Sequence, residues 1–125
     1  IADPEFGGDA HPCADYVPPQ LRFGAHTAPL GMRFYSGAMF PAEYRGDAFV
    51  ALHGSWNRSR KSGYQVVRVR VDGGKAVAAE PFVQGWLQGE KVLGGPVDLL
   101  VMPDGSMLVS DDKSGAIYRI THASD

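Results

Sequence analysis

Glycine and proline interrupt the chain so often that neither a long helix nor a long strand can form. The 125 residues include 16 Gly and 9 Pro, about a fifth of the chain against an average near 12%. Apolar residues nowhere keep the i, i+3, i+4 spacing of an amphipathic helix between good caps. The sequence therefore predicts an all-β fold built from short strands and many turns.

Short runs rich in β-branched and aromatic residues predict strands in two groups. The first group is expected at Met32–Tyr35, Ala48–His53, Tyr64–Val71 and Ala76–Val83, and the second at Val97–Met102, Ser106–Ser110 and Gly115–Thr121. Asp72-Gly73-Gly74 is typical of a tight hairpin turn, so successive strands are expected to form antiparallel four-stranded meanders. Residues 1–30 are rich in proline without an apolar period, which indicates an extended N-terminal loop, held in place by Tyr16, Val17 and Phe23.

The two groups resemble each other. Lys61-Ser62-Gly63 and Lys113-Ser114-Gly115 each lie between an apolar strand and a run that carries an arginine. Their separation of about 50 residues is close to that of blade repeats in β-propellers. The repeat predicts about two blades, with residues 31–84 as the first blade and residues 85–125 as a second, incomplete one. A β-sandwich of seven strands is the alternative.

Composition excludes several classes of function. The net charge is −2, with 44% hydrophobic and 21% charged residues, which is typical of a globular domain and argues against a nucleic-acid partner. No apolar run approaches the roughly 18 residues of a membrane span. The N-terminus lacks the basic and apolar regions of a signal peptide. The single cysteine, Cys13, excludes an intrachain disulfide and a cysteine-based zinc site.

The segment from Ala51 to Arg58 gathers the polar and aromatic groups that binding sites use. It follows a strand, where a rigid scaffold gives way to a loop. Trp56 is suited to stacking on a planar ring or a sugar, His53 to carrying or donating a proton, and Arg58 to holding an anion. The alternative is that Trp56 caps the core and Arg58 is merely solvated. His26 precedes the first strand and is expected at the same rim.

The sequence contains little that indicates a metal site or a serine hydrolase. The four histidines do not pair at the i, i+4 spacing of a zinc-binding helix, and no serine lies in a Gly-x-Ser-x-Gly elbow. Asp111-Asp112 has oxygens that suit a hard cation such as calcium, but such a pair more often makes hydrogen bonds within a turn. The identity of any metal ligand stays open.

Several long motifs resemble the glucose/sorbosone dehydrogenases. They are His26–Tyr35, Phe40–Arg58, Pro96-Val97-Asp98, Leu108–Asp112 and Ile117–Ile120. The resemblance implies a six-bladed β-propeller that oxidises the C1 hydroxyl of sugars with pyrroloquinoline quinone and calcium, in a periplasmic or secreted protein. It covers residues 24 to 121, and it implies that the chain is the C-terminal part of such an enzyme.

The resemblance also implies roles for individual residues. His53 stands where quinone-binding relatives place a lysine against the cofactor, and we expect Trp56 and Arg58 to bind the cofactor as well. Gly95 stands where sorbosone-type relatives carry arginine, so a cation suited to the quinone carboxylates is absent and quinone binding by this chain is weakened. His26 is expected to contact the sugar. The family's catalytic histidine and most calcium ligands lie upstream of the matched region.

Two functions remain open. The chain is either a part of a quinoprotein sugar dehydrogenase, inactive alone, or a noncatalytic module that binds sugar or serves a structural role. Two blades leave two apolar faces uncovered, since a blade buries its faces only against neighbours. We therefore expect the chain to contact further blades or to self-associate, as a ring of three or a twofold dimer.

Overall fold

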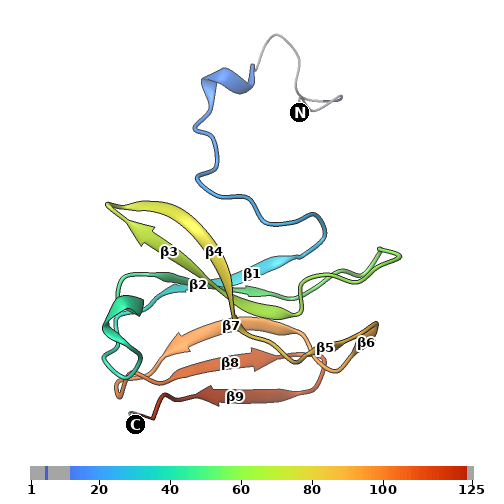
Figure 1. The fold of residues 1–125 in the computed structure, drawn as a ribbon. Helices are drawn as coiled ribbons and strands as arrows, with labels where there is room; N and C mark the ends of the chain where they lie inside the picture. The colour runs from blue at the N-terminus through green and yellow to red at the C-terminus, as the bar shows by residue number, and fades with distance from the viewer. Residues whose placement is uncertain (1–4, 6–11, 124–125) are drawn as a thin grey trace.

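Two antiparallel sheets lie one above the other in the computed structural model, which describes residue 5 and residues 12–123 (Figure 1). The first sheet contains β1 (Pro29–Phe34), β2 (Ala48–Leu52), β3 (Gln65–Asp72) and β4 (Lys75–Val83), in that order. The second contains β7 (Pro96–Val101), β8 (Met107–Asp111) and β9 (Ala116–Ile120), also in chain order. A small hairpin of β5 (Leu87–Gln88) and β6 (Lys91–Val92) lies between them in the chain.

The only helical segments in this described part are two short 3-10 turns, η1 (Cys13–Asp15) and η2 (Ala42–Tyr44). The prediction of an all-β, antiparallel protein is therefore confirmed. No helix among the described residues is long and apolar enough to cross a membrane.

Most strand boundaries lie within one residue of the expectation, and two larger differences concern β1 and the β5–β6 hairpin. β1 begins at Pro29, three residues early, because proline is tolerated as the first residue of a strand. An irregularity in the β1–β2 register accommodates the next two residues. The hairpin of β5 and β6 lies between the two expected strand groups, where the sequence predicted no strand, because strands of two residues are too short to show alternation.

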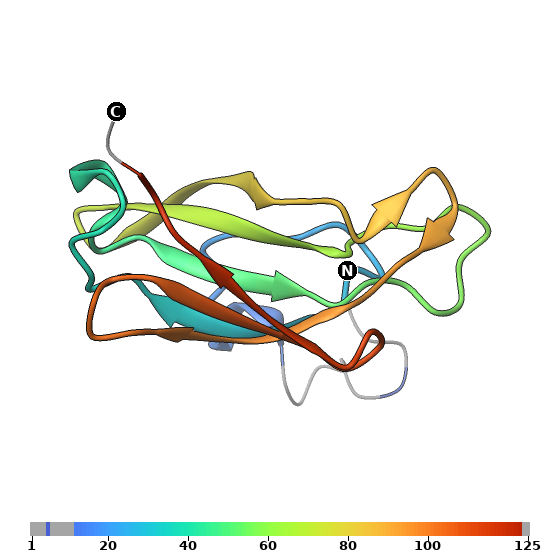
Figure 2. The same cartoon turned by 90° about the horizontal axis from the view of Figure 1, so that it is seen from below.

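The main core is built from residues of both sheets, whose strands are seen from below in Figure 2. It is built by ten buried residues, Tyr35, Phe40, Phe49, Ala51, Tyr64, Val66, Trp86, Leu99, Met107 and Val109. Alternation along β2 sends Phe49 and Ala51 toward the second sheet, whereas Val50 and Leu52 face the opposite side. Trp86, rather than Trp56, is the tryptophan of this core, with an exposed fraction of 6% against 90%.

Strands β1 and β7 approach each other closely enough to require a glycine. A Cβ atom at Gly31 would lie 2.6 Å from the Cα of Asp98 and 2.8 Å from the carbonyl oxygen of Val97. Arg33 donates from Nε to the carbonyl of Leu99 at 3.0 Å. The hydroxyl of Tyr35 donates to the carbonyl of Gly105 at 2.7 Å. These contacts fix the two sheets relative to each other.

The sequence repeat corresponds to a structural one. Each Lys-Ser-Gly triplet lies between an antiparallel strand pair, β2 with β3 and β8 with β9. Arg68 on β3 pairs with Asp47, which precedes β2, at 2.6 Å between Nε and Oδ2. Arg119 on β9 pairs with Asp104, which precedes β8. The same strand, loop and ion-pair arrangement therefore occurs twice.

The outer face of the first sheet is covered in part by the N-terminal segment. Leu21 and Phe23 pack against a cluster of Ala48, Val50, Leu52, Val67 and Val69. Gln20 ties the segment to β4 by accepting a hydrogen bond from the Ala76 amide at 2.8 Å. Phe23 thus packs as predicted, whereas Tyr16 and Val17 are exposed at 60% and 94%. Residues 1–4 and 6–11 of the expected loop lie outside the described residues.

Candidate functional site

The predicted site residues lie at one end of the two sheets. β2 and β8 end there, and β1, β3, β7 and β9 begin there, at the right of Figure 1. The long loop between β2 and β3, residues 53–64, and the β5–β6 hairpin lie at the same end. Glu90 of the hairpin accepts a hydrogen bond from the Lys61 amide at 3.0 Å, which joins the two loops. We call this end the rim.

His53 is held at the rim from two sides. Its amide donates to the carbonyl of Ala28 at 3.0 Å, so the residue continues the β1–β2 pairing. Its Nε2 lies 2.8 Å from Oδ1 of Asp112, at the end of β8. The ring also covers Gly95, since a Cβ atom there would lie 3.0 Å from Nε2. The two predicted residues His53 and Gly95 are therefore neighbours at the rim.

Asp111, the last residue of β8, stabilises the turn that follows this strand. Oδ1 of Asp111 accepts hydrogen bonds from the amides of Gly95, Lys113 and Ser114 at 2.9–3.0 Å. Burial raises the pKa of the Asp111 carboxyl, but the hydrogen bonds from Gly95 and Ser114 outweigh this, and the pKa lies below its usual value. No group of three His, Cys, Asp or Glu side chains in the described ranges could hold a metal ion. The turn interpretation of Asp111 is the one that the structure supports.

Trp56 and Arg58 lie on the long loop. Trp56 is 90% exposed and makes no ring contact within the described part of the chain, so the alternative in which it caps the core is wrong. Arg58 donates from Nη1 to the carbonyl of Ala25 and to Oγ of Ser62, both at 3.0 Å. It is exposed, but these bonds fix its position.

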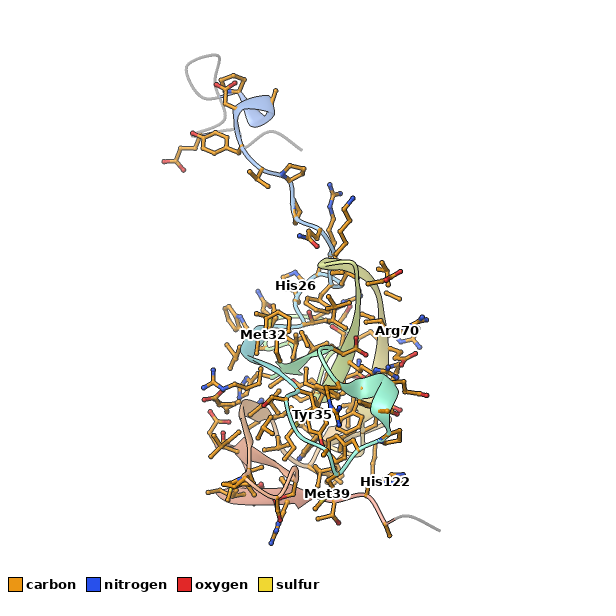
Figure 3. All side chains as sticks on the ribbon, turned by 90° about the vertical axis from the view of Figure 1, so that its left-hand side faces the viewer. His26, Met32, Tyr35, Met39, Arg70 and His122 are labelled. Carbon is orange, nitrogen blue, oxygen red and sulfur yellow. The ribbon has the colours of Figure 1, made fainter. Side chains whose placement is uncertain are left out.

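His26 lies beside the Arg58 contact, in the turn that precedes β1. Its backbone φ of +62° is one that few residues other than glycine adopt. The amide of Gly54 donates to the carbonyl of the next residue, Thr27, at 3.0 Å. Figure 3 shows His26 at the N-terminal side of the first sheet and His122 beyond the second sheet, so these two histidines are far apart.

Sequence reasoning missed Tyr64 and Lys113 as parts of the rim. Tyr64 is buried, and its hydroxyl donates to the carbonyl of Ser55. The ammonium of Lys113 lies 5.0 Å from the centre of the Tyr64 ring. The repeat of the Lys-Ser-Gly triplet was the only signal for Lys113, because it places that lysine at the same end as Lys61.

Comparisons with known proteins support a quinoprotein origin. Residues 2–123 match a family model described as TrAA12-like. The chain is 35% identical over 136 residues to a pyrroloquinoline quinone-dependent pyranose dehydrogenase of Coprinopsis cinerea, covering 93% of this chain and 18% of that protein. It is 41% identical over 108 residues to an uncharacterized protein of Borreliella burgdorferi, covering 84% of this chain and 28% of the relative.

Solved structures of quinoprotein dehydrogenase domains and AA12 enzymes are also similar to this chain. The holo form of the pyranose dehydrogenase quinone domain from Coprinopsis cinerea is similar with a TM-score of 0.70 and 30% identity, over 93% of this chain and 32% of that one. An iodide structure of the Trichoderma reesei Carbohydrate-Active Enzymes Family AA12 gives 0.68 and 25%, over 83% and 27%. The chain thus spans less than a third of the length of these relatives. It belongs to the TrAA12-like family, among the pyrroloquinoline quinone-dependent sugar dehydrogenases.

Proposed function

We propose that this chain forms about two blades of a six-bladed β-propeller, the C-terminal part of a quinoprotein sugar dehydrogenase, and that its rim holds pyrroloquinoline quinone. The first sheet supplies one complete blade and the second an incomplete one. The duplicated strand, loop and ion-pair arrangement supports this, as does the similarity to the quinone domain of the pyranose dehydrogenase. The same resemblance supports a periplasmic or secreted location.

The observation that carries the proposal is the contact of His53 with both Asp112 and Gly95. It joins the end of β2 in the first sheet to β7 and β8 in the second, so the site lies where two sheets meet. Cofactor sites occur at such junctions because rigid elements fix several side chains at once. His53 is the residue with which we expect the quinone to be in direct contact.

The donor set of the rim fits this cofactor. The quinone is planar and carries several carboxylates, which require a stacking surface and cations. The exposed indole of Trp56 offers the surface, and Arg58 offers a guanidinium whose Nη1 is bonded only to neutral oxygens. Gly95 leaves its position without a side chain of its own. We assign His53, Trp56, Arg58 and Gly95 to the cofactor and His26 to the sugar.

The described residues do not fit calcium. The carboxylate of Asp111 is occupied by three amides, and Asp112 is occupied by His53. We therefore assign no calcium ligand to this chain and derive no step through that ion.

When bound, the quinone supplies the hydride acceptor for oxidation of the sugar. His53 controls one proton beside it. With the proton of a neutral ring on Nε2, that atom donates to Asp112 and Nδ1 is left as an acceptor, whereas the charged ring donates from both nitrogens. The carboxylate of Asp112 therefore fixes the orientation of the ring.

We propose that the chain alone does not oxidise aldoses. The resemblance places the family's catalytic histidine in an earlier blade, and a general base contributes about 10² to 10⁴ in rate. The chain's contribution is to bind and orient the cofactor. The rest of the propeller, or further copies of the chain, would cover its outer faces.

The test is a titration of the purified chain with pyrroloquinoline quinone in the presence of calcium, followed by the absorbance of the quinone. We expect saturable binding, weakened about tenfold in His53→Ala, as for the loss of a hydrogen bond to a charged group. His122→Ala, beyond the second sheet, is the matched control and is expected to bind like the parent chain. Sugar-dependent reduction of a dye should remain absent.

Two results would contradict the proposal. An absence of saturable quinone binding would favour the noncatalytic module instead. Dye reduction that depends on sugar and quinone would show that the chain contains the whole catalytic machinery.

A further inference from the structure

We propose that Lys113 is a further cofactor-binding residue, whose ammonium binds a carboxylate of the planar quinone beside His53. This inference rests on the proposed function of the rim. It identifies a cation that the sequence motifs did not reveal, since Lys113 is far in the chain from the segment that carries His53, Trp56 and Arg58.

The backbone of Lys113 is fixed next to Gly95. One carboxylate oxygen, Oδ1 of Asp111, accepts hydrogen bonds from the amides of Gly95 at 2.9 Å and Lys113 at 3.0 Å. The start of β7 and the β8–β9 turn are therefore bound to the same atom. Because Asp111 is only 3% exposed, this connection is shielded from water and is strong.

The side chain of Lys113 also lies next to Gly95. A Cβ atom at Gly95 would lie 3.1 Å from Cδ of Lys113, and 3.0 Å from Cδ2 and Nε2 of His53. The lysine stem and the imidazole therefore both lie against Gly95 and fill the space that a side chain there would need. A group bound next to His53 would also be within reach of the lysine.

The ammonium lacks a carboxylate partner. It lies 5.0 Å from the centre of the Tyr64 ring, and no ion pair of Lys113 occurs in the described ranges. The neighbouring acids are already bound, Asp112 to His53 and Glu90 to Lys61. A cation over an aromatic face still attracts an anion, since the ring offers only a quadrupole and not a full negative charge.

The comparison with Lys61 strengthens the argument. Lys61 holds the equivalent place in the first Lys-Ser-Gly triplet, but its Nζ lies 3.9 Å from Oε2 of Glu90. Lys113 has no such acid, although it is at the same rim. The second triplet therefore has a free cation where the first has a neutralised one. A ligand with carboxylates is the chemistry that would use it.

The experiment compares quinone binding by the 125-residue chain with that of Lys113→Met, Lys113→Arg and Lys75→Met, using equilibrium dialysis. Lys113→Met keeps the stem and removes the charge, and should weaken binding about tenfold. Lys113→Arg keeps the charge and should remain within about threefold of the parent. Lys75 is the first residue of β4, at the opposite end of the first sheet, so Lys75→Met is the control for net charge.

A second probe tests the carboxylate itself. With the uncharged trimethyl ester of the same quinone, Lys113→Met and the parent chain should bind equally. Binding of the acid should also depend less on salt in Lys113→Met, because one charge contact is missing.

The possible failures are distinguishable. If the parent chain does not bind the quinone, both the proposed function and the role of Lys113 are wrong. If the parent binds but Lys113→Met binds equally well, only the role of Lys113 is wrong. Equal losses in Lys113→Met and Lys75→Met would also contradict it, because net charge and not position would then decide binding.

Discussion

Asp111 connects several parts of the rim through one carboxylate. Its carboxylate joins the start of β7 to the β8–β9 turn through three amides, and Oδ2 lies 3.3 Å from the hydroxyl of Tyr118. The sequence left a choice between a cation ligand and a turn residue. The spacing of two aspartates cannot decide this, because the deciding partner, Gly95, is 16 residues away.

Asp111 should make the stability of the chain depend on pH. Its pKa is lowered in the folded state, so its contribution is fully present above the unfolded value of about 3.9 and is lost as the pH falls through the folded value. Urea unfolding at pH 6 and pH 3 should show Asp111→Asn destabilised by about 1–3 kcal/mol at pH 6 and less sensitive to acid. Asp72→Asn, in the exposed β3–β4 turn, is the control. Equal pH dependence in Asp111→Asn and the parent chain would contradict this role.

At the scale of the elements, the strands were predictable and their junctions were not. The expected runs at Ala48–His53 and Ala76–Val83 match β2 and β4 closely, because short runs with aromatic and β-branched residues between turn signals indicate strands. The ring of Tyr64 beside Gly54 and the His53 contact with Asp112 depend on how loops fold across two sheets. Local sequence patterns contain no information about such distant partners.

The loop of residues 53–64 depends on Gly54. Its φ is +108°, and a Cβ atom there would enter the ring of Tyr64. Gly54→Ala should therefore combine backbone strain with overpacking and destabilise the chain by about 2–5 kcal/mol. Gly46→Ala is the matched control, because its φ is +88° and a Cβ atom there meets nothing within 4 Å. Urea unfolding measures both.

For Gly46→Ala we expect a loss of about 1 kcal/mol from the backbone alone. Gly46→Ala measures the cost of the backbone conformation alone, and Gly54→Ala adds the steric conflict with the Tyr64 ring. If they are equally destabilised, Tyr64 does not pack tightly against the loop, and the explanation of the loop geometry is wrong.

At the scale of the whole molecule, both sheets have an apolar outer face. On the first sheet, an apolar groove of about 430 Å³ includes Met32 and Phe34, which are 51% and 59% exposed. On the second sheet, Leu100 and Ile117 are 53% and 71% exposed. Leu21 and Phe23 cover only part of the first face. Exposed apolar patches of this kind indicate contact with another protein surface.

The isolated chain should therefore self-associate. Head-to-tail contacts with the angular step of a six-bladed propeller would close a ring of three, and face-to-face contacts would give a twofold dimer. Light scattering coupled to size exclusion should give a mass above the 13.4 kDa of one chain at micromolar concentration. Phe34→Ser and Ile117→Ser each place a polar group on one of the two outer faces. If the chain forms a ring, either substitution should lower the measured mass. A monomer at all concentrations would contradict this prediction.

The central claim is that the rim at the ends of β2 and β8 binds a planar quinone with carboxylates. The most direct measurement is a map of backbone amide shifts by NMR as pyrroloquinoline quinone is added to the labelled chain. We predict that the amides of Gly54, Gly95, Lys113 and Ser114 shift together and saturate, while those of Gly73 and Gly74 in the β3–β4 turn do not move. Shifts confined to the apolar groove beside Phe23 and Ala76, or to the β3–β4 turn, would contradict the account.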